Sequence, residues 1–288
     1  MRLFNISNDF NSYQQLIHFY NDNKNKMFAD IELDLKQFFC ANLSAALGAI
    51  LDKLIINSNN ICFTNIDKAI ETILKKNDFL SFYGYNSEKD IYGTTVKYKK
   101  ILPRDAKYFR NYIEKEFIES NLSNLPNMSM GVKHSIIEAI YEIFVNAQIH
   151  SQTEYIYSCG QLFHTKNEIF FTLVDTGITI KDCVNNRFNS SLTSLQAIKW
   201  ALEDKNTTKR NITGGIGLAF LKEFIKNNKG LLQIVSNDGY YSFDEKGEQY
   251  KLFSGKFPGT IVTIKFRTDD KCHYSLKSEK DINLENIF

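Results

Sequence analysis

Apolar and polar residues recur along this chain of 288 residues with two different periods, and each period predicts a type of secondary structure. The longest helical pattern covers residues 136–150, which contain neither Pro nor Gly and are long enough for about four turns. Four polar side chains spaced four residues apart stack on one face of this helix: Glu138, Glu142, Asn146 and His150. Apolar residues occupy the opposite face. The polar face can carry functional side chains, or it can be the solvated face of an ordinary amphipathic helix. Motifs elsewhere in the sequence must decide between these two interpretations.

The rest of the C-terminal part combines strand and helix patterns, which predicts an α/β fold. Strands are expected at residues 94–102, 154–159, 168–174, 231–236, 240–243, 249–253 and 260–266. Helices are expected at about 105–120 and at 218–226. Residues 178–213 are rich in Asn, Ser, Thr and Lys apart from a helical island at 195–202, and such a segment between core elements is typical of a lid or binding loop.

The N-terminal part predicts a smaller α/β unit. Helices are expected at 9–25, 43–54 and from 67 to 74, and strands at 29–35 and 61–64. A polar stretch at 83–92 separates this unit from the next strand. We therefore expect an interaction domain at 1–90, a second domain at 91–268 and a polar tail at 269–288.

Composition and charge exclude several classes of function. The formal net charge is +2, so there is no bulk electrostatic reason to expect nucleic acid or an anionic membrane as a partner. No apolar run reaches the roughly 18 residues that a membrane span needs, and the first residues lack the apolar core of a signal peptide. The five cysteines are scattered without a CxxC pair, which favours reduced thiols in a cytoplasmic protein.

Three short motifs follow one another in an order that suits a nucleotide. Glu142 and Asn146 lie one turn apart on the predicted helix, Asp175-Thr-Gly177 ends a strand, and Gly214-Gly215-Ile-Gly217-Leu218 begins a helix. Glycine-rich backbone at a helix start offers N–H groups to phosphate. Amide and carboxylate oxygens suit Mg²⁺ and the activation of an attacking water, and a strand-end aspartate can accept from the amine of adenine. Each motif alone is also a common helix face or turn.

Together the motifs resemble the GHKL superfamily, the ATP-binding domain of gyrase, heat-shock chaperone, histidine kinase and mismatch-repair proteins. Residues 142–150 are similar to its N box, Asp175-Thr-Gly177 to the first half of its D-x-G-x-G box, and residues 214–218 to its second glycine box. Gly259-Thr260 resembles its late threonine motif. The resemblance covers about residues 94–267 and implies a Bergerat-type sandwich, with helices on one face of a mixed, mainly antiparallel sheet.

The resemblance also implies ATP and Mg²⁺ as ligands and assigns roles to individual residues. Glu142 would activate water and Asn146 would bind the metal, while Asp175 and Thr260 would serve the adenine region. Further nucleotide contacts are expected from the remaining motif residues: Gly177, Gly214, Gly215, Gly217 and Leu218. Lys209 in the lid either reaches the γ-phosphate or is a solvated loop charge.

Two departures narrow the type of GHKL protein. Thr179 replaces the second glycine of the D-x-G-x-G box, which leaves the conformation after Asp175 open. No long helix pair carries a phospho-accepting histidine, so a sensor histidine kinase is not expected. The chain instead resembles the stand-alone ATPase or serine kinase of the anti-sigma-factor type. Residues 31–48 are similar to a STAS domain but lack its Asp-Ser-Ser-Gly phosphoacceptor, and Ser44 is expected to be a packing residue.

Two functions therefore stand side by side. In the first, the protein hydrolyses ATP or transfers its γ-phosphate to a Ser or Thr of a protein partner, which is held by the N-terminal domain. In the second, ATP orders the lid and switches an interaction without chemistry. A degenerate nucleotide site on a scaffold is a weaker third option. The resemblance also allows a homodimer.

Overall fold

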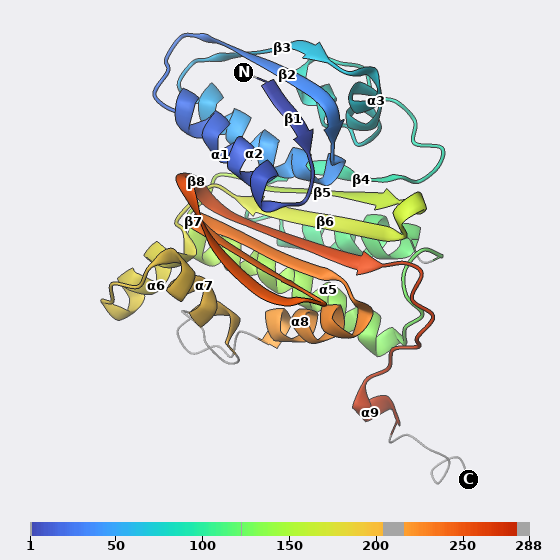
Figure 1. Cartoon of the computed structure of the whole chain (residues 1–288). Helices are drawn as coiled ribbons and strands as arrows, with labels where there is room; N and C mark the ends of the chain where they lie inside the picture. The colour runs from blue at the N-terminus through green and yellow to red at the C-terminus, as the bar shows by residue number, and fades with distance from the viewer. Residues whose placement is uncertain (1, 122, 204–215, 281–288) are drawn as a thin grey trace, which may run out of the picture.

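Four layers of secondary structure make up the protein: a three-stranded sheet, a pair of helices, a five-stranded sheet and a second group of helices (Figure 1). The structure is a computed structural model that describes residues 2–121, 123–203 and 216–280. Both parts of the chain mix strands and helices, which confirms the predicted α/β class.

The three-stranded sheet belongs to the N-terminal unit and is parallel, in the order β1-β2-β3. Its strands are β1 (Arg2–Ile6), β2 (Asp30–Phe39) and β3 (Asn60–Ile66). Each strand is followed by a helix: α1 (Phe10–Asn23), α2 (Ser44–Ile55) and α3 (Lys68–Lys76). Strand β1 was not predicted, because a bulge between Phe4 and Ile6 breaks the period of two and leaves the buried Leu3 and Ile6 three residues apart.

The five-stranded sheet is antiparallel throughout, in the order β4-β5-β6-β8-β7. Its strands are β4 (Thr95–Ile101), β5 (Ile156–Phe163), β6 (Glu168–Asp175), β7 (Leu231–Asp244) and β8 (Gly247–Arg267). The prediction of four separate strands between residues 231 and 266 was wrong. Register shifts around Asn237 let one long hairpin continue past the irregular point instead of ending there.

Helices cover the lower face of this sheet, as Figure 1 shows for α5 (Met130–Asn146) and α8 (Ile216–Asn228). Helix α4 (Ala106–Tyr112) and the π-helix η3 (Ile113–Ile118) lie in the same layer and together replace the single helix predicted at 105–120. Phe109 stacks on Phe144 with ring centroids 4.3 Å apart. Helix α5 begins earlier than predicted because the Ser129 side chain caps it by accepting the N–H of Val132.

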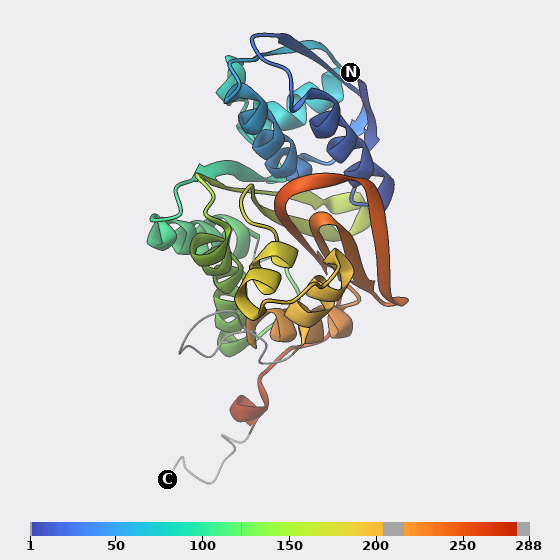
Figure 2. The ribbon, with the colours of Figure 1, turned by 90° about the vertical axis from the view of Figure 1, so that its left-hand side faces the viewer.

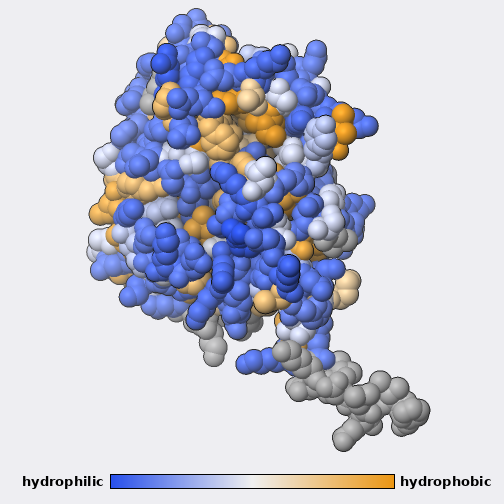
Figure 3. Space-filling model, turned by 45° about the vertical axis from the view of Figure 1, so that its right-hand side comes forward, coloured by the Kyte–Doolittle hydropathy of each residue, from blue (hydrophilic) through white to orange (hydrophobic). Residues whose placement is uncertain are grey.

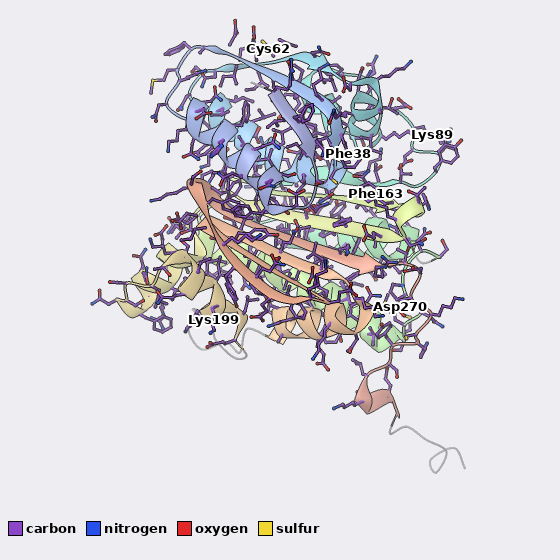
Figure 4. The ribbon with its side chains drawn as sticks, viewed as in Figure 1. Phe38, Cys62, Lys89, Phe163, Lys199 and Asp270 are labelled. Atoms are coloured by element: carbon purple, nitrogen blue, oxygen red, sulfur yellow. The ribbon has the colours of Figure 1, made fainter. Side chains whose placement is uncertain are left out.

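The upper face of the sheet is covered by α1 and α2 of the N-terminal unit. Phe38 of β2 and Phe163 of β5 meet at this junction with ring centroids 6.3 Å apart (Figure 4). One continuous set of buried apolar side chains includes Leu47 of α2 and Val174 of β6. The two units therefore share a hydrophobic core, so that each lends the other buried area.

Residues 178–203, the described part of the expected lid, contain more helix than the sequence predicted. They contain α6 (Ile180–Phe188) and α7 (Ser194–Leu202), which lie beside the end of the sheet where β6 ends (Figure 2). Thr179 and Thr193 cap the two helices by accepting backbone N–H groups through their side chains. Polar composition therefore marks helix caps and solvated helix faces here, and the island at 195–202 corresponds to α7. Residues 204–213 of the expected lid lie outside the described residues.

The polar stretch after residue 268 is anchored to the domain as far as the structure describes it. Tyr274 pairs with Met128 in a β-bridge, and its ring lies 5.0 Å from that of Phe224. Helix α9 (Lys277–Lys280) brings the carboxylate of Glu279 to the start of α5, where it accepts the Gly131 N–H at 3.1 Å. A carboxylate at a helix N-terminus is favourable, which explains why this charged segment is not a loose tail.

The surface shown in Figure 3 is mainly hydrophilic, and its apolar side chains form separate groups. None of the helices in the described ranges is both long and apolar enough to cross a membrane. The five cysteines all lie in these ranges and form no disulfide with one another. Cys159 is fully buried, and burial raises the pKa of its thiol to about 12.

Candidate functional site

A cavity opens between the lower face of the five-stranded sheet and the helices below it. Its walls come from α5 and the turn that follows it, from β6, β7 and β8, from α6 and α7, and from the first turn of α8. Five of the residues predicted to bind a nucleotide line it: Glu142, Asn146, Asp175, Leu218 and Thr260. The structure therefore brings together residues that are up to 118 positions apart in the sequence (260 minus 142).

The polar face of α5 is split between the cavity and the surface. Glu142, Asn146 and His150 line the cavity. Glu138 points elsewhere and forms an ion pair with Arg110 of α4, with His134 at 3.8 Å. The four polar residues therefore lie on one stripe of the helix, but its first member, Glu138, connects α5 to α4. The remaining three members face the cavity.

Beyond Asn146 the helix widens into the π-helix η5 (Ala147–Ser151), a form that is common at functional sites. The carbonyl of Ser151 accepts the N–H of Ile178 at 2.6 Å. This contact ties the end of α5 to the segment that follows β6. Two cavity walls are therefore held together by backbone hydrogen bonding.

Asp175 is the buried acid of the cavity, with only 5% of its surface exposed. Burial raises the pKa of its carboxyl to about 7, although the N–H of Gly177 donates to it at 3.1 Å and Lys53 of α2 lies close enough to oppose the shift. A buried carboxyl group with few donors around it is suited to accept hydrogen bonds from a ligand.

Gly177 is required by a close approach of two backbones. A Cβ atom at this position would lie 1.7 Å from the carbonyl oxygen of Ser151. Gly177 does not itself line the cavity; it lets the chain pass under η5 and directs its N–H to Asp175.

Thr179, which stands where the GHKL motif has its second glycine, has a definite role in this structure. Its hydroxyl donates to the Asp182 carboxylate at 2.6 Å and accepts the N–H of the same residue, so it begins α6. The chain turns into a helix at this point, and a side-chain cap replaces the conformational freedom of a glycine.

Gly217 packs the start of α8 against α5. Its N–H donates to the Glu142 carboxylate at 2.8 Å, and a Cβ atom would lie 3.1 Å from the Cα of Ala139. The first turn of α8 therefore already binds an oxyanion, as helix N-termini do. Gly214, Gly215 and Lys209, also predicted to bind nucleotide, lie outside the described residues.

Thr260 lies on β8 directly opposite Asp175 of β6 and Ser236 of β7. The Ser236 and Thr260 hydroxyl oxygens are 3.0 Å apart. Ser236 was not predicted as a site residue. It shares a face of β7 with Ile234, which lines the cavity, because strand residues two apart share a face, but only the structure shows which face this is.

Apolar side chains that were not predicted make up most of the remaining wall: Ile143, Ala147, Leu173, Ile178, Ile180, Val184, Trp200, Ile234 and Val262. Trp200 is the one tryptophan of the sequence, and its ring meets that of Phe188 at 5.2 Å. Because α6 was expected to be loop, its inward face could not be assigned. The cavity thus combines an apolar wall with a few polar groups, as small-molecule sites do.

Within the described part of the chain, no group of three or more His, Cys, Asp or Glu side chains could hold a metal ion. The cavity does contain the amide oxygen of Asn146 and the carboxylate of Glu142. Hard oxygen donors of this kind fit a Mg²⁺ ion that keeps most of its ligands as waters and phosphate oxygens.

Comparison with known proteins does not identify a family for this chain. No family model matches it, and no curated protein matches it.

Proposed function

We propose that the cavity binds Mg·ATP and that the C-terminal unit is a Bergerat-type ATP-binding domain of the GHKL kind. One observation carries the proposal. Glu142, Asn146, Asp175 and Thr260, which come from three separate elements, line a single cavity whose far wall is the first turn of α8. Along the chain, α5, the hairpin of β5 and β6, the helices α6, α7 and α8, and the hairpin of β7 and β8 follow one another, and this order supports that architecture.

In this proposal the adenine ring lies at the end of β6, where the Asp175 carboxylate accepts a hydrogen bond from its exocyclic amine. The phosphates lie toward α8, where backbone N–H groups bind anions. Asn146 supplies an amide oxygen to Mg²⁺, which would neutralise phosphate charge and hold the terminal phosphates in place. The resemblance assigns further phosphate contacts to Gly214 and Gly215.

Glu142 has the position to activate water or a partner hydroxyl. It lies on the same face of α5 as Asn146, one turn away, and contacts the first turn of α8 through Gly217. A carboxylate beside the phosphate end can accept the proton of an attacking group while the metal stabilises the transferred phosphoryl group. We therefore place ATP hydrolysis, or transfer to a partner Ser or Thr, at this residue.

The N-terminal unit is proposed to be a STAS-like domain that binds the protein partner. Its alternating strands and helices and its parallel sheet support this assignment. Ser44 is fully buried and donates to the Ala41 carbonyl at 2.7 Å, so it is a packing residue and no phosphoacceptor. A cytoplasmic location, where ATP and Mg²⁺ are present and thiols stay reduced, agrees with five cysteines that form no disulfide with one another.

The test compares two glutamates of the same helix. Glu142→Gln should retain ATP binding and lose turnover by about 100-fold or more, because the variant removes the general base and keeps the shape of the side chain. Glu138→Gln is the matched control, since Glu138 pairs with Arg110 outside the cavity. Equal turnover in the native protein and Glu142→Gln would exclude the catalytic role.

An ATP sensor without chemistry is the second candidate, and the packing of α2 on the strand that ends in Asp175 favours it. Lys53 of α2 lies near Asp175, and the neighbouring Asp52 accepts the Tyr157 hydroxyl of β5 at 2.7 Å. A ligand bound in the cavity can therefore affect the N-terminal unit through α2. Saturating Mg·ATP at about 100 times Kd should stabilise the native protein by about 2.7 kcal/mol in either case. Binding without any product over hours supports the sensor, and the absence of stabilisation contradicts both candidates.

A further inference from the structure

Ser236 is a buried serine whose hydroxyl group meets three neighbours at the edge of the cavity. Its surface is 1% exposed. The Ile180 N–H, at the start of α6, points to its oxygen at 3.0 Å. The carbonyl of Gly259 lies 3.2 Å away and the hydroxyl of Thr260 lies 3.0 Å away.

Hydrogen-bond accounting determines the direction of these contacts. A serine hydroxyl has one proton to donate and two lone pairs that accept. A carbonyl can only accept and an N–H can only donate. If Ser236 donates to Gly259 and accepts from Ile180, its remaining lone pair accepts the proton of Thr260. All of these contacts are then used, which is the arrangement that buried polar groups adopt.

This arrangement determines what Thr260 presents to the cavity. Because its proton is directed to Ser236, the hydroxyl of Thr260 offers only lone pairs toward the ligand. Asp175 lies opposite Thr260 on the neighbouring strand and, when ionised, also offers only acceptors. Asp175 and Thr260 therefore place two hydrogen-bond acceptors side by side on the sheet wall of the cavity, which we call the acceptor floor.

We infer that Ser236 is a specificity-determining positioning residue, which holds the Thr260 hydroxyl as an acceptor so that the site selects a purine with an amino group at C6 over one with a carbonyl. An amino group has two protons to donate to such a floor. A carbonyl oxygen would face lone pairs, and buried mismatches of this kind discriminate strongly. The inference rests on the proposed function, because it concerns the base of the nucleotide.

The experiment measures Kd for ATP and for ITP, which differ in the group at C6, well below the melting temperature. We expect the native protein to prefer ATP by about tenfold or more. In Ser236→Ala the Thr260 hydroxyl can rotate and donate to the carbonyl of ITP. The ratio of the two Kd values should then fall by about three- to tenfold, the range of one hydrogen bond.

Two matched variants separate this role from general support of the fold. Ser236→Thr keeps a hydroxyl and should retain the native ratio. Ser242→Ala removes another buried serine of the same strand that does not line the cavity, and it should also retain the ratio. A role limited to structure would weaken both nucleotides equally in Ser236→Ala and leave the ratio unchanged, which would overturn the inference.

The native protein distinguishes this failure from failure of the proposed function. If it binds ATP and the ratio is unchanged in Ser236→Ala, only the present inference is wrong. If it binds both nucleotides equally, the acceptor floor is excluded while the ATP site stands. If it binds neither nucleotide, the proposed function fails and takes this inference with it.

Discussion

The two faces of the five-stranded sheet use the same strands in opposite ways. On β6, Leu173 and Asp175 face the cavity, whereas Thr172 and Val174 face the N-terminal unit. The upper face is closed by apolar packing, and its polar side chains pair with one another: the hydroxyls of Thr172 and Thr263 lie 2.9 Å apart, and Tyr13 joins them at 2.9 Å. The lower face leaves a cavity whose polar groups include Asp175 and Thr260 of the sheet and Glu142 and Asn146 of α5.

The difference teaches where chemistry can be placed on such a sheet. On the closed face the side chains of Thr172, Thr263 and Tyr13 are satisfied within the protein, because an unpaired buried group is costly. On the cavity face, polar groups such as Asp175 and Thr260 can be left for a ligand, since the cavity leaves space beside them. Substitutions on the two faces should therefore separate stability from nucleotide binding.

The largest effect is expected from Gly177→Ala on the cavity face. The new Cβ would collide with the Ser151 carbonyl, so the chain must move η5 and the start of α6. We expect a loss of about 3 kcal/mol or more in unfolding free energy, together with loss of ATP binding. Urea denaturation measures the first and calorimetric titration the second. Gly255→Ala, where the nearest atom is the Ile17 Cγ2 at 3.0 Å, is the control and should cost less than about 1 kcal/mol.

The second effect is a gain in stability that depends on pH. The pKa of Asp175 is raised to about 7 in the folded protein by burial, against an ordinary value of 3.8. The favourable contribution of the Asp175 carboxyl to the unfolding free energy is complete below pH 3.8 and is lost as the pH rises through 7, because burial disfavours the ionised form in the folded protein. Asp175→Asn should therefore be more stable than the native protein at pH 8, by about 2 kcal/mol, and the gap should close as the pH falls toward 4.

Urea denaturation at pH 5 and pH 8 tests this sign. Asp67→Asn is a control of the opposite sign, because the N–H of Gln37 donates to Asp67 at 2.7 Å and, with Lys36, holds the pKa of that carboxyl below its usual range. A larger advantage of Asp175→Asn at pH 5 than at pH 8 would contradict the burial of an ionisable group. The same variant should bind ATP weakly at every pH.

The third effect is on the closed face alone. Tyr13→Phe removes the hydroxyl that contacts Thr263 and donates to Gln233 at 3.2 Å, and leaves buried partners unsatisfied. We expect a loss of about 1–2 kcal/mol with unchanged ATP affinity. Tyr20→Phe on the same helix is the matched control and should change stability by no more than about 0.5 kcal/mol. A parallel loss of ATP affinity in Tyr13→Phe would show that the two faces are coupled.

The smallest effect is expected from Thr179→Gly, which introduces the glycine found at this position in the GHKL motif that the sequence resembles. The variant loses the cap of α6 and should cost less than about 1 kcal/mol, because glycine is itself tolerated as a cap. ATP affinity should stay within about twofold of the native value. A large rise in affinity would show that the side chain of Thr179 obstructs the nucleotide.

Sequence reasoning located most of the elements with a regular period and failed where tertiary contacts overrode the period. Helix α2, with its small apolar residues, and strand β6, which is buried along its length, were both expected within two residues of their bounds. Strand β1 was missed because a bulge broke its alternation. Helix α7 was expected as a helical segment at 195–202. Helix α6 was predicted as loop, because its short apolar face is visible only once the cavity and β7 lie beside it.

The sequence by itself determined the polar stripe of α5, the strand-end acid Asp175 and Gly217 at the start of α8, because local spacing decides which side chains share a helix face or end a strand. Only the tertiary structure decided that Glu138 serves a helix junction while Glu142 faces the cavity. It alone decided that Gly177 passes beneath η5, and that Ser236 lies across from Thr260. Those relations depend on strand register and on the approach of distant backbones. Both are fixed only when strands pair and one face of the sheet is buried, and this involves residues far apart in the sequence.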